Sequence, residues 1–225
     1  MYFQTLDDKG ECVGVYKDGK LYFEDIPSGC ARTWKYAEYL EKDDVDYGSI
    51  YCGNRSLNDA CPNFLIDDWV AVEDKLKAYY RSFVLAKVNM DENCFFDLVP
   101  KPFLLEYCEI RNKITQYVFE NYEKPQNYDF MVDLTKVLTR IRHQKLNIDV
   151  STLSNKAHLA KFRKAMKKFS QIDPYCRYNI NGTKTGRLTT QKNSFPVMTM
   201  DKDFRSIVKP TNDWFVELDF NAAEV

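Results

Sequence analysis

The sequence lacks several features that would place the protein in a special class. No apolar run reaches the ~18 residues needed to cross a bilayer, and no basic-then-apolar leader opens the chain. We therefore expect no membrane partner, no secretion and a cytoplasmic location. The seven cysteines are odd in number and contain no C-x-x-C pair, which indicates neither a zinc site nor a disulfide framework. Reduced thiols are the expectation. The two histidines, His143 and His158, have no ligand partner at useful spacing.

The charge of the chain is unevenly distributed. The sequence has 225 residues, 44% hydrophobic and 29% charged, a balance typical of one large or two small globular domains. The formal net charge is only −1. However, residues 155–210 hold thirteen Lys and Arg against three acidic residues, a local charge of +10, whereas residues 1–60 have a local charge of −5. The first of these segments would attract a polyanion and the second would not.

Apolar spacing and turn residues predict an α+β fold. Residues 1–26 are typical of a β-meander, with a tight turn at Asp18-Gly19, because Gly supplies the positive φ that such a turn needs. The remaining pattern predicts helices at 34–40, 69–86, 102–121 and 155–170, an amphipathic helix around 134–141, and strands at 47–52, 177–181 and 214–220.

The predicted helix at 155–170 has one apolar stripe, formed by Leu159, Phe162, Met166 and Phe169. Its other faces are crowded with lysines, which are Lys156, Lys161, Lys164, Lys167 and Lys168. These lysines could simply solvate an exposed helix. The same charge continues past the helix, however, which favours one continuous surface for a polyanion.

The end of the sequence carries a series of motifs. Residues 178–188 end in Thr-Gly-Arg-Leu, residues 193–196 read Asn-Ser-Phe-Pro, and residues 219–225 read Asp-Phe-Asn-Ala-Ala-Glu-Val. In this order they resemble the Thr-Gly-Arg-Leu segment, the Gln-Asn-Ile-Pro segment and motif A (usually Asp-Tyr-Ser-x-Ile-Glu-Leu) of family A (DNA polymerase I type) DNA polymerases. Residues 134–153 are similar to the helix and Ile-Asp turn that precede the thumb of these enzymes. The resemblance covers residues 127–225 well and residues 1–126 poorly.

The resemblance implies a catalytic role for the last residues. Asp219 would be one of two catalytic aspartates that hold paired Mg²⁺ ions, and the carbonyl of Phe220 would add a metal ligand. Glu224 matches the glutamate that excludes a ribose 2′-hydroxyl. Taken alone, an aspartate at a strand end is more typical of a turn or cap, and Glu224 is more typical of a solvated residue.

The resemblance also implies contacts with primer–template DNA. Arg187 matches an arginine that reaches the minor groove, where it meets acceptors common to every base pair. Isolated, it would be taken for a surface arginine after a glycine turn. Further residues would line the same duplex or bind its phosphates, which gives affinity without sequence specificity. They are Thr185, Lys184, Asn193, Arg205, Lys156, Lys161, Lys164, Lys167 and Lys168.

The sequence departs from the family at both ends. It stops at Val225, inside motif A, so the fingers and the second palm aspartate would have to come from a C-terminal polymerase fragment, or the chain is truncated. A split gene, with or without splicing of the two halves, would explain this. At the N-terminus, Gln4-Thr5-Leu6 stands where the 3′–5′ exonuclease site needs D-x-E, and the nearby acids Asp7, Asp8, Glu24 and Asp25 look solvated, so we expect no exonuclease activity.

These observations define three expected regions: a degenerate exonuclease-like α/β region at 1–100, a helical connector with a reduced thumb at 101–175, and the first palm strands at 176–225. The leading hypothesis is the N-terminal part of a split DNA polymerase that takes dNTPs and is inactive alone. A viral source, and hence the host cytoplasm, fits so compact an enzyme. The alternatives are a non-catalytic DNA-binding replication module and an unrelated small α/β protein with a basic tail.

Overall fold

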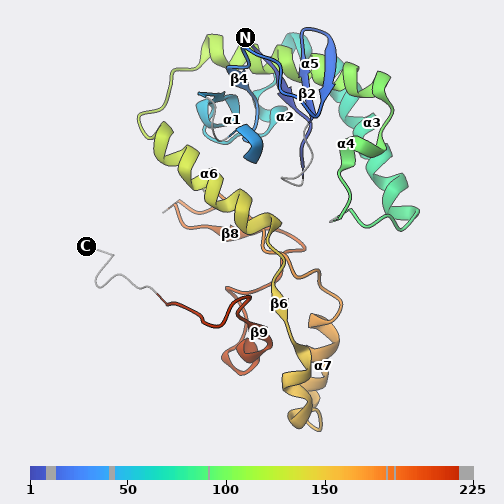
Figure 1. Cartoon of the computed structure of the whole chain (residues 1–225), viewed down its shortest axis with the longest axis vertical. Helices are drawn as coiled ribbons and strands as arrows, with labels where there is room; N and C mark the ends of the chain where they lie inside the picture. The colour runs from blue at the N-terminus through green and yellow to red at the C-terminus, as the bar shows by residue number, and fades with distance from the viewer. Residues whose placement is uncertain (9–13, 41–43, 91, 181, 185, 218–225) are drawn as a thin grey trace. The chain divides into compact units, whose positions relative to one another are not determined.

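The computed structural model describes residues 1–8, 14–40, 44–90, 92–180, 182–184 and 186–217. The chain divides into two compact units, residues 1–139 and 140–225, which we call unit 1 and unit 2 (Figure 1). Helices predominate and strands are short, so the fold class is α+β as the sequence predicted. Over the part of the chain that is described, none of the helices combines the length and apolar character that crossing a bilayer requires.

Unit 1 begins with the predicted meander. Strands β1 (Gln4–Thr5), β2 (Gly14–Lys17) and β3 (Lys20–Phe23) form an antiparallel sheet in that order. Asp18 and Gly19 both have positive φ, 48° and 78°, which confirms the tight turn between β2 and β3.

Two acids near the meander are less exposed than expected. Asp7 is only 9% exposed, and both carboxylate oxygens of Asp8 accept a hydrogen bond from the backbone N–H of Phe95 at 3.3 Å. The expectation that these acids are solvated is therefore wrong for Asp7, and Asp8 caps a helix. Glu24 and Asp25 are exposed, as expected.

The segment after the meander was predicted incorrectly. The expected helix at 34–40 is only the 3₁₀ turn η1 (Glu38–Leu40), and the expected strand at 47–52 is the helix α1 (Gly48–Tyr51). Two short strands that the sequence did not indicate, β4 (Arg32–Thr33) before η1 and β5 (Asp46–Tyr47) before α1, form a parallel pair. Gly48 at the start of α1 lies close to the Trp34 ring, and a Cβ at this position would stand 3.3 Å from that ring.

The long helices of unit 1 confirm the helices that the apolar spacing predicted at 69–86 and 102–121. Helix α3 (Ile66–Leu85) follows the short elements α2 (Leu57–Ala60) and η2 (Asn63–Leu65), and α5 (Lys101–Asn121) follows α4 (Phe95–Leu98). On α5, Ile110, Ile114 and Val118 are buried on one face, as predicted. The core between these helices is rich in aromatic rings, among them Trp69, Tyr107 and Phe103.

Helix α6 (Tyr128–His143) confirms the amphipathic helix predicted around 134–141 and extends beyond it at both ends. The Tyr128 hydroxyl accepts a hydrogen bond from the backbone N–H of Tyr47 at 2.7 Å, which fixes the start of the helix against β5. The apolar stripe of α6 is only partly buried, since Val137 is exposed while Leu134, Leu138 and Ile141 are half-buried.

Unit 2 is built from short elements around a second apolar core. Strand β6 (Asn147–Ile148) pairs with β9 (Val208–Lys209), and β7 (Tyr178–Asn179) pairs with β8 (Thr189–Thr190), both antiparallel. The core takes residues from η3 (Val150–Lys156), α7 (Ala160–Phe169) and η4 (Lys202–Ile207). Its members include Phe162, Phe169, Phe195, Phe204 and Ile207.

Two predictions for unit 2 need correction. The expected helix at 155–170 is broken, because η3 ends at Lys156 and α7 begins at Ala160. Arg163 holds the intervening turn, since its Nη1 donates to the carbonyls of Ala157 and His158 at 3.0 and 2.7 Å. The expected strand at 214–220 is also wrong over its described part. Residues 214–217 form no strand, and the side chain of Trp214 is 83% exposed.

Candidate nucleic-acid interface

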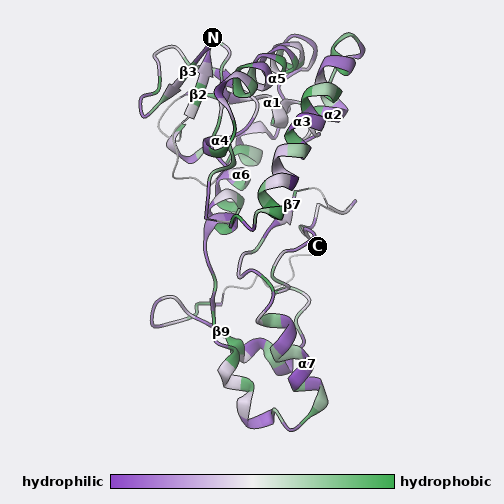
Figure 2. Cartoon of the chain, turned by 90° about the vertical axis from the view of Figure 1, so that its right-hand side faces the viewer, coloured by the Kyte–Doolittle hydropathy of each residue, from purple (hydrophilic) through white to green (hydrophobic). Residues whose placement is uncertain are grey.

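The predicted DNA-binding lysines lie on and beside α7. Phe162, Ala165 and Phe169 recur at intervals of three and four residues and point into the core. The apolar face of α7 therefore packs on the core, and its other faces carry charged side chains. Figure 2 shows this as a mixture of hydrophobic (green) and hydrophilic (purple) residues along α7. The lysines predicted from the sequence, Lys156, Lys161, Lys164, Lys167 and Lys168, are all exposed.

Lys161 differs from the other lysines because it is already paired. Its ammonium lies 2.8 Å from a carboxylate oxygen of Asp201 and 2.8 Å from one of Asp203, at the start of η4. Hydrogen bonds to Asp201 and then Asp203 raise the pKa of Lys161, and the Lys161 hydrogen bond lowers the pKa of Asp201. The charge of Lys161 is thus largely offset by its neighbours, and a phosphate would have to displace them.

Lys164 and Lys168 line a hollow of about 380 Å³ between α7 and the 196–204 segment. Pro196, Met200 and Phe169 contribute apolar surface to this hollow, and the paired Lys161 and Asp201 also line it. No carboxylate in the described ranges forms an ion pair with Lys164 or Lys168. Both charges are therefore available to an anionic ligand.

The β7–β8 hairpin carries the residues of the Thr-Gly-Arg-Leu motif. Lys184 and Arg187 lie in its loop with exposed side chains, and Gly186 has φ +76°. The backbone N–H of Arg187 donates to the hydroxyl of Thr183 at 3.0 Å, which fixes the turn that presents the arginine. Gly182 allows close approach of the two strands, because a Cβ there would stand 2.0 Å from the Thr189 hydroxyl.

The last two predicted contacts sit at turns. Asn193 is exposed in the left-handed conformation, with φ +65°, directly before the buried pair Ser194 and Phe195. Ser194 accepts a hydrogen bond from the backbone N–H of Arg177 at 2.9 Å, which anchors this turn to β7. Arg205 is exposed on η4.

The structure brings some of these residues together. The Lys161 pairs join α7 to η4, so the α7 lysines and Arg205 belong to one region of unit 2. Packing of Phe169 against Phe195, with ring centroids 5.8 Å apart, links α7 to the segment that bears Asn193. Lys184 and Arg187 lie together on the loop between β7 and β8.

The remaining predicted site residues, Thr185, Asp219, Phe220 and Glu224, lie outside the described residues. Their proposed roles, including the holding of Mg²⁺, stay predictions. Within the ranges that are described, no three His, Cys, Asp or Glu side chains gather as a possible metal site. Among the described residues, Cys52, Cys61, Cys108 and Cys176 are free thiols, and burial raises the pKa of Cys108 to about 12.

A second polar site lies in unit 1, on residues that were not selected from the sequence. Arg111 on α5 is 4% exposed and lines a pocket with Arg81 of α3. The signal was present in the helical spacing, because Leu104, Cys108, Arg111 and Thr115 recur at intervals of four, three and four residues. An arginine in such a buried stripe indicates a specific partner.

Comparison with known proteins gives no match: no family model fits the chain, and neither the curated proteins nor the solved structures contain a significant relative.

Proposed function

We propose that the chain is the N-terminal part of a DNA-directed DNA polymerase of the family A type. The observation that carries the proposal is the ordered series of motifs in one chain, from residues 134–153 through Thr-Gly-Arg-Leu and Asn-Ser-Phe-Pro to the Asp219 segment. Each motif alone is unspecific. Their common order over residues 127–225 is what favours a polymerase over an unrelated basic protein.

Unit 2 would hold the primer–template duplex. The exposed ammonium groups of Lys164, Lys167 and Lys168, which form no ion pair with a described carboxylate, support this role, because they can bind phosphates of any sequence. Arg187 sits on a turned loop with its side chain exposed, as a contact with the minor groove requires. Together these groups would give binding that depends on salt and not on sequence.

Catalysis would centre on Asp219. Its carboxylate and the carbonyl of Phe220 would hold Mg²⁺, and Glu224 would exclude ribonucleotides. The chemistry that paired Mg²⁺ ions supply is activation of the primer 3′-hydroxyl and neutralisation of the triphosphate. One aspartate cannot hold two ions, so the second acid and the dNTP-binding fingers would come from a C-terminal polymerase segment.

Unit 1 has one feature that is consistent with the same proposal. Residues 1–100 would be a degenerate exonuclease-like region, and residues 101–175 a connector with a reduced thumb. The side chain of Gln4 is fully buried and donates to Asn112 Oδ1 and Thr115 Oγ1 at 3.0 and 3.1 Å. Gln4 is thus a buried structural residue at a position where an exonuclease site would need a metal-binding carboxylate. This supports the expectation that the region does not cleave DNA.

Primer extension tests the proposal. The chain is mixed with the polypeptide encoded downstream of it, and Mg²⁺-dependent extension of a labelled primer is followed. We expect extension by the mixture and by neither component alone. Asp219→Ala abolishes it, whereas the matched control Asp213→Ala, six residues earlier and exposed, retains it.

Two outcomes would contradict the proposal. Extension that survives Asp219→Ala would remove that residue from the metal site. No extension by the mixture, with salt-dependent duplex binding intact, would instead establish a non-catalytic DNA-binding module of a replication complex.

A further inference from the structure

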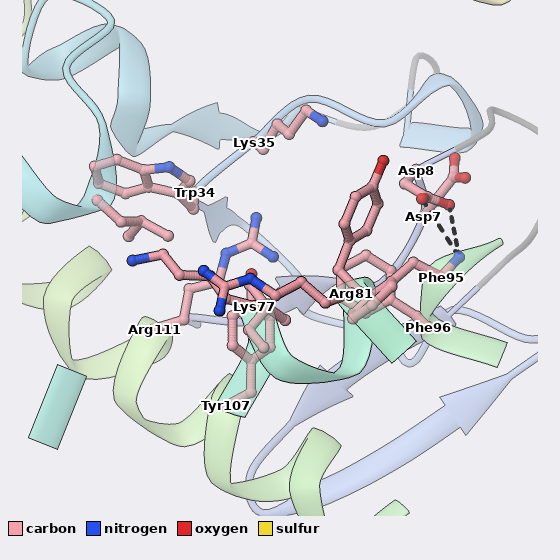
Figure 3. Close-up of a pocket in the computed structure, with 13 residues that line it drawn as sticks. Asp7, Asp8, Trp34, Lys35, Lys77, Arg81, Phe95, Phe96, Tyr107 and Arg111 are labelled. Carbon is pink, nitrogen blue, oxygen red and sulfur yellow. Dashed lines mark hydrogen bonds between the residues drawn. The ribbon is translucent and has the colours of Figure 1, made fainter. Parts of the chain in front are cut away.

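Unit 1 contains a pocket of about 500 Å³ whose walls are mainly apolar and include five aromatic rings (Figure 3). Its lining comes from the segments after β1 and after β4, and from α2, α3, α4 and α5. The rings of Trp34, Tyr80, Phe95, Phe96 and Tyr107 face it. The volume lies within the ~300–1,000 Å³ typical of sites for small organic ligands.

One wall of the pocket holds a buried arginine, Arg111. Arg111 is 4% exposed and its Nη1 donates to the carbonyl of Thr5 at 3.0 Å, but its buried Nε has no acceptor. Its guanidinium lies 5.8 Å from the centroid of the Tyr107 ring. No carboxylate of the described residues forms an ion pair with Arg111. Burying an unpaired charge is costly, so this position favours an anion close by.

Arg81 of α3 adds a second cation to the same pocket. Its side chain is exposed and has no ion pair within the described part of the chain. Lys77 also lines the pocket, but it is held by Glu73 at 2.7 Å. In Figure 3 the side chains of Arg111, Lys77 and Arg81 lie on the side toward Trp34, whereas Asp7 and Asp8 lie at the other end.

The charge pattern restricts the ligand. Guanidinium groups match the planar oxygen pairs of carboxylate and phosphate, and two of them reach the same end of the pocket. The acidic residues at the opposite end disfavour a ligand that is anionic along its whole length. The aromatic walls between the two ends suit a flat ring, which can stack on them and contact the arginines at its edge.

We propose that this pocket binds a small organic anion with an aromatic ring, held by Arg111 and Arg81. Two classes of ligand combine an aromatic ring with an anionic group of this kind: aromatic carboxylates and nucleoside monophosphates. The proposal does not depend on polymerase activity, because it concerns unit 1 and only residues that the structure describes. It requires no metal ion, since the anion is met by arginine.

Calorimetric titration of the full chain tests it with four probes: adenosine 5′-monophosphate, 4-hydroxyphenylacetate, adenosine and inorganic phosphate. We expect saturable binding of at least one of the two aromatic anions, and binding weaker by about tenfold or more for adenosine and for phosphate, which each lack half of the recognised chemistry. The tighter of the two anions identifies phosphate or carboxylate as the preferred group. A bound ligand also raises the midpoint of thermal unfolding.

Variants locate the binding. Arg81→Gln changes an exposed side chain, so it should leave the midpoint without ligand unchanged and weaken binding about tenfold. Arg55→Gln, an exposed arginine outside the pocket, is the matched control and should bind normally. Arg111→Lys keeps the charge and removes the planar fork, and should also weaken binding. If Arg111→Lys does not fold, the affinity of Arg81→Gln decides whether the anion binds in this pocket. The proposal is overturned if neither aromatic anion saturates the protein or if both bind equally well to Arg81→Gln.

Discussion

Neighbouring lysines of α7 should contribute unequally to DNA binding. Lys164 has no carboxylate partner within the described ranges, whereas Lys161 lies 2.8 Å from both Asp201 and Asp203. A phosphate can bind Lys164 and release counterions, but at Lys161 it must displace two carboxylates that are already in place. Nothing in the sequence distinguishes the two lysines, so a difference between them would test the ion pairs of Lys161 with Asp201 and Asp203.

The magnitude follows from counterion release. Each phosphate contact changes the slope of log K against log salt concentration by about 0.9 on B-form DNA. Lys164→Gln should therefore reduce the slope by about 0.9, and Lys161→Gln should change it much less. Replacing both carboxylates, with Asp201→Asn and Asp203→Asn together, frees Lys161. The fall of log K with log salt concentration should then become steeper by up to about 0.9.

Fluorescence anisotropy with a short labelled duplex, measured over a series of salt concentrations, gives these slopes. Exposed ion pairs add little to stability, so all the variants should remain folded. Circular dichroism checks this. The reasoning would be refuted if Lys161→Gln lowered the slope as much as Lys164→Gln, or if the double Asp→Asn variant bound no better than the parent chain.

Three further predictions concern stability and chemical reactivity. Tyr128→Phe leaves the backbone N–H of Tyr47 without its 2.7 Å acceptor and should cost about 1–3 kcal/mol of unfolding free energy in a urea titration; no loss would mean that water replaces the hydroxyl. Phe195→Ala empties a fully buried site in unit 2 and should cost about 3–5 kcal/mol, measured by circular dichroism; a cost under 1 kcal/mol would indicate a core that collapses freely. Burial raises the pKa of Cys108 from 9.0 to about 12, so the folded state keeps its proton longer than the unfolded state does. Stability should therefore fall as pH rises from 9 towards 12, less so in Cys108→Ala, and at pH 8 a thiol reagent should label half-buried Cys61 well before Cys108.

Elements with strong local signals could be predicted from the sequence. Helices α3 and α5 have long apolar stripes with helical spacing, and the Asp18-Gly19 turn needs a residue that tolerates positive φ. Residues 34–52 gave no such signal, because their elements are two to four residues long and their apolar side chains pack in several directions. The break before α7 also escaped prediction, because it depends on the hydrogen bonds of the Arg163 side chain.

The candidate interface was predictable only in part. The exposure of the α7 lysines followed from the apolar stripe on the opposite side of the helix. The pairing of Lys161 with Asp201 and Asp203 joins residues about forty positions apart, and no local pattern contains it. The pocket around Arg111 likewise collects residues from four helices and two further segments, so only its buried arginine could have indicated it in advance.

The placement of the three tryptophans has a consequence for how the protein can be observed. Trp34 and Trp69 are buried in unit 1, whereas Trp214 is 83% exposed in unit 2. The emission of a tryptophan shifts on unfolding only if its surroundings change from apolar to aqueous. Intrinsic fluorescence is thus a reporter of unit 1 alone, and a melting curve recorded in this way would stay silent if unit 2 unfolded first. Comparison with the far-ultraviolet signal, to which the helices of both units contribute, would separate the two transitions in a single unlabelled sample.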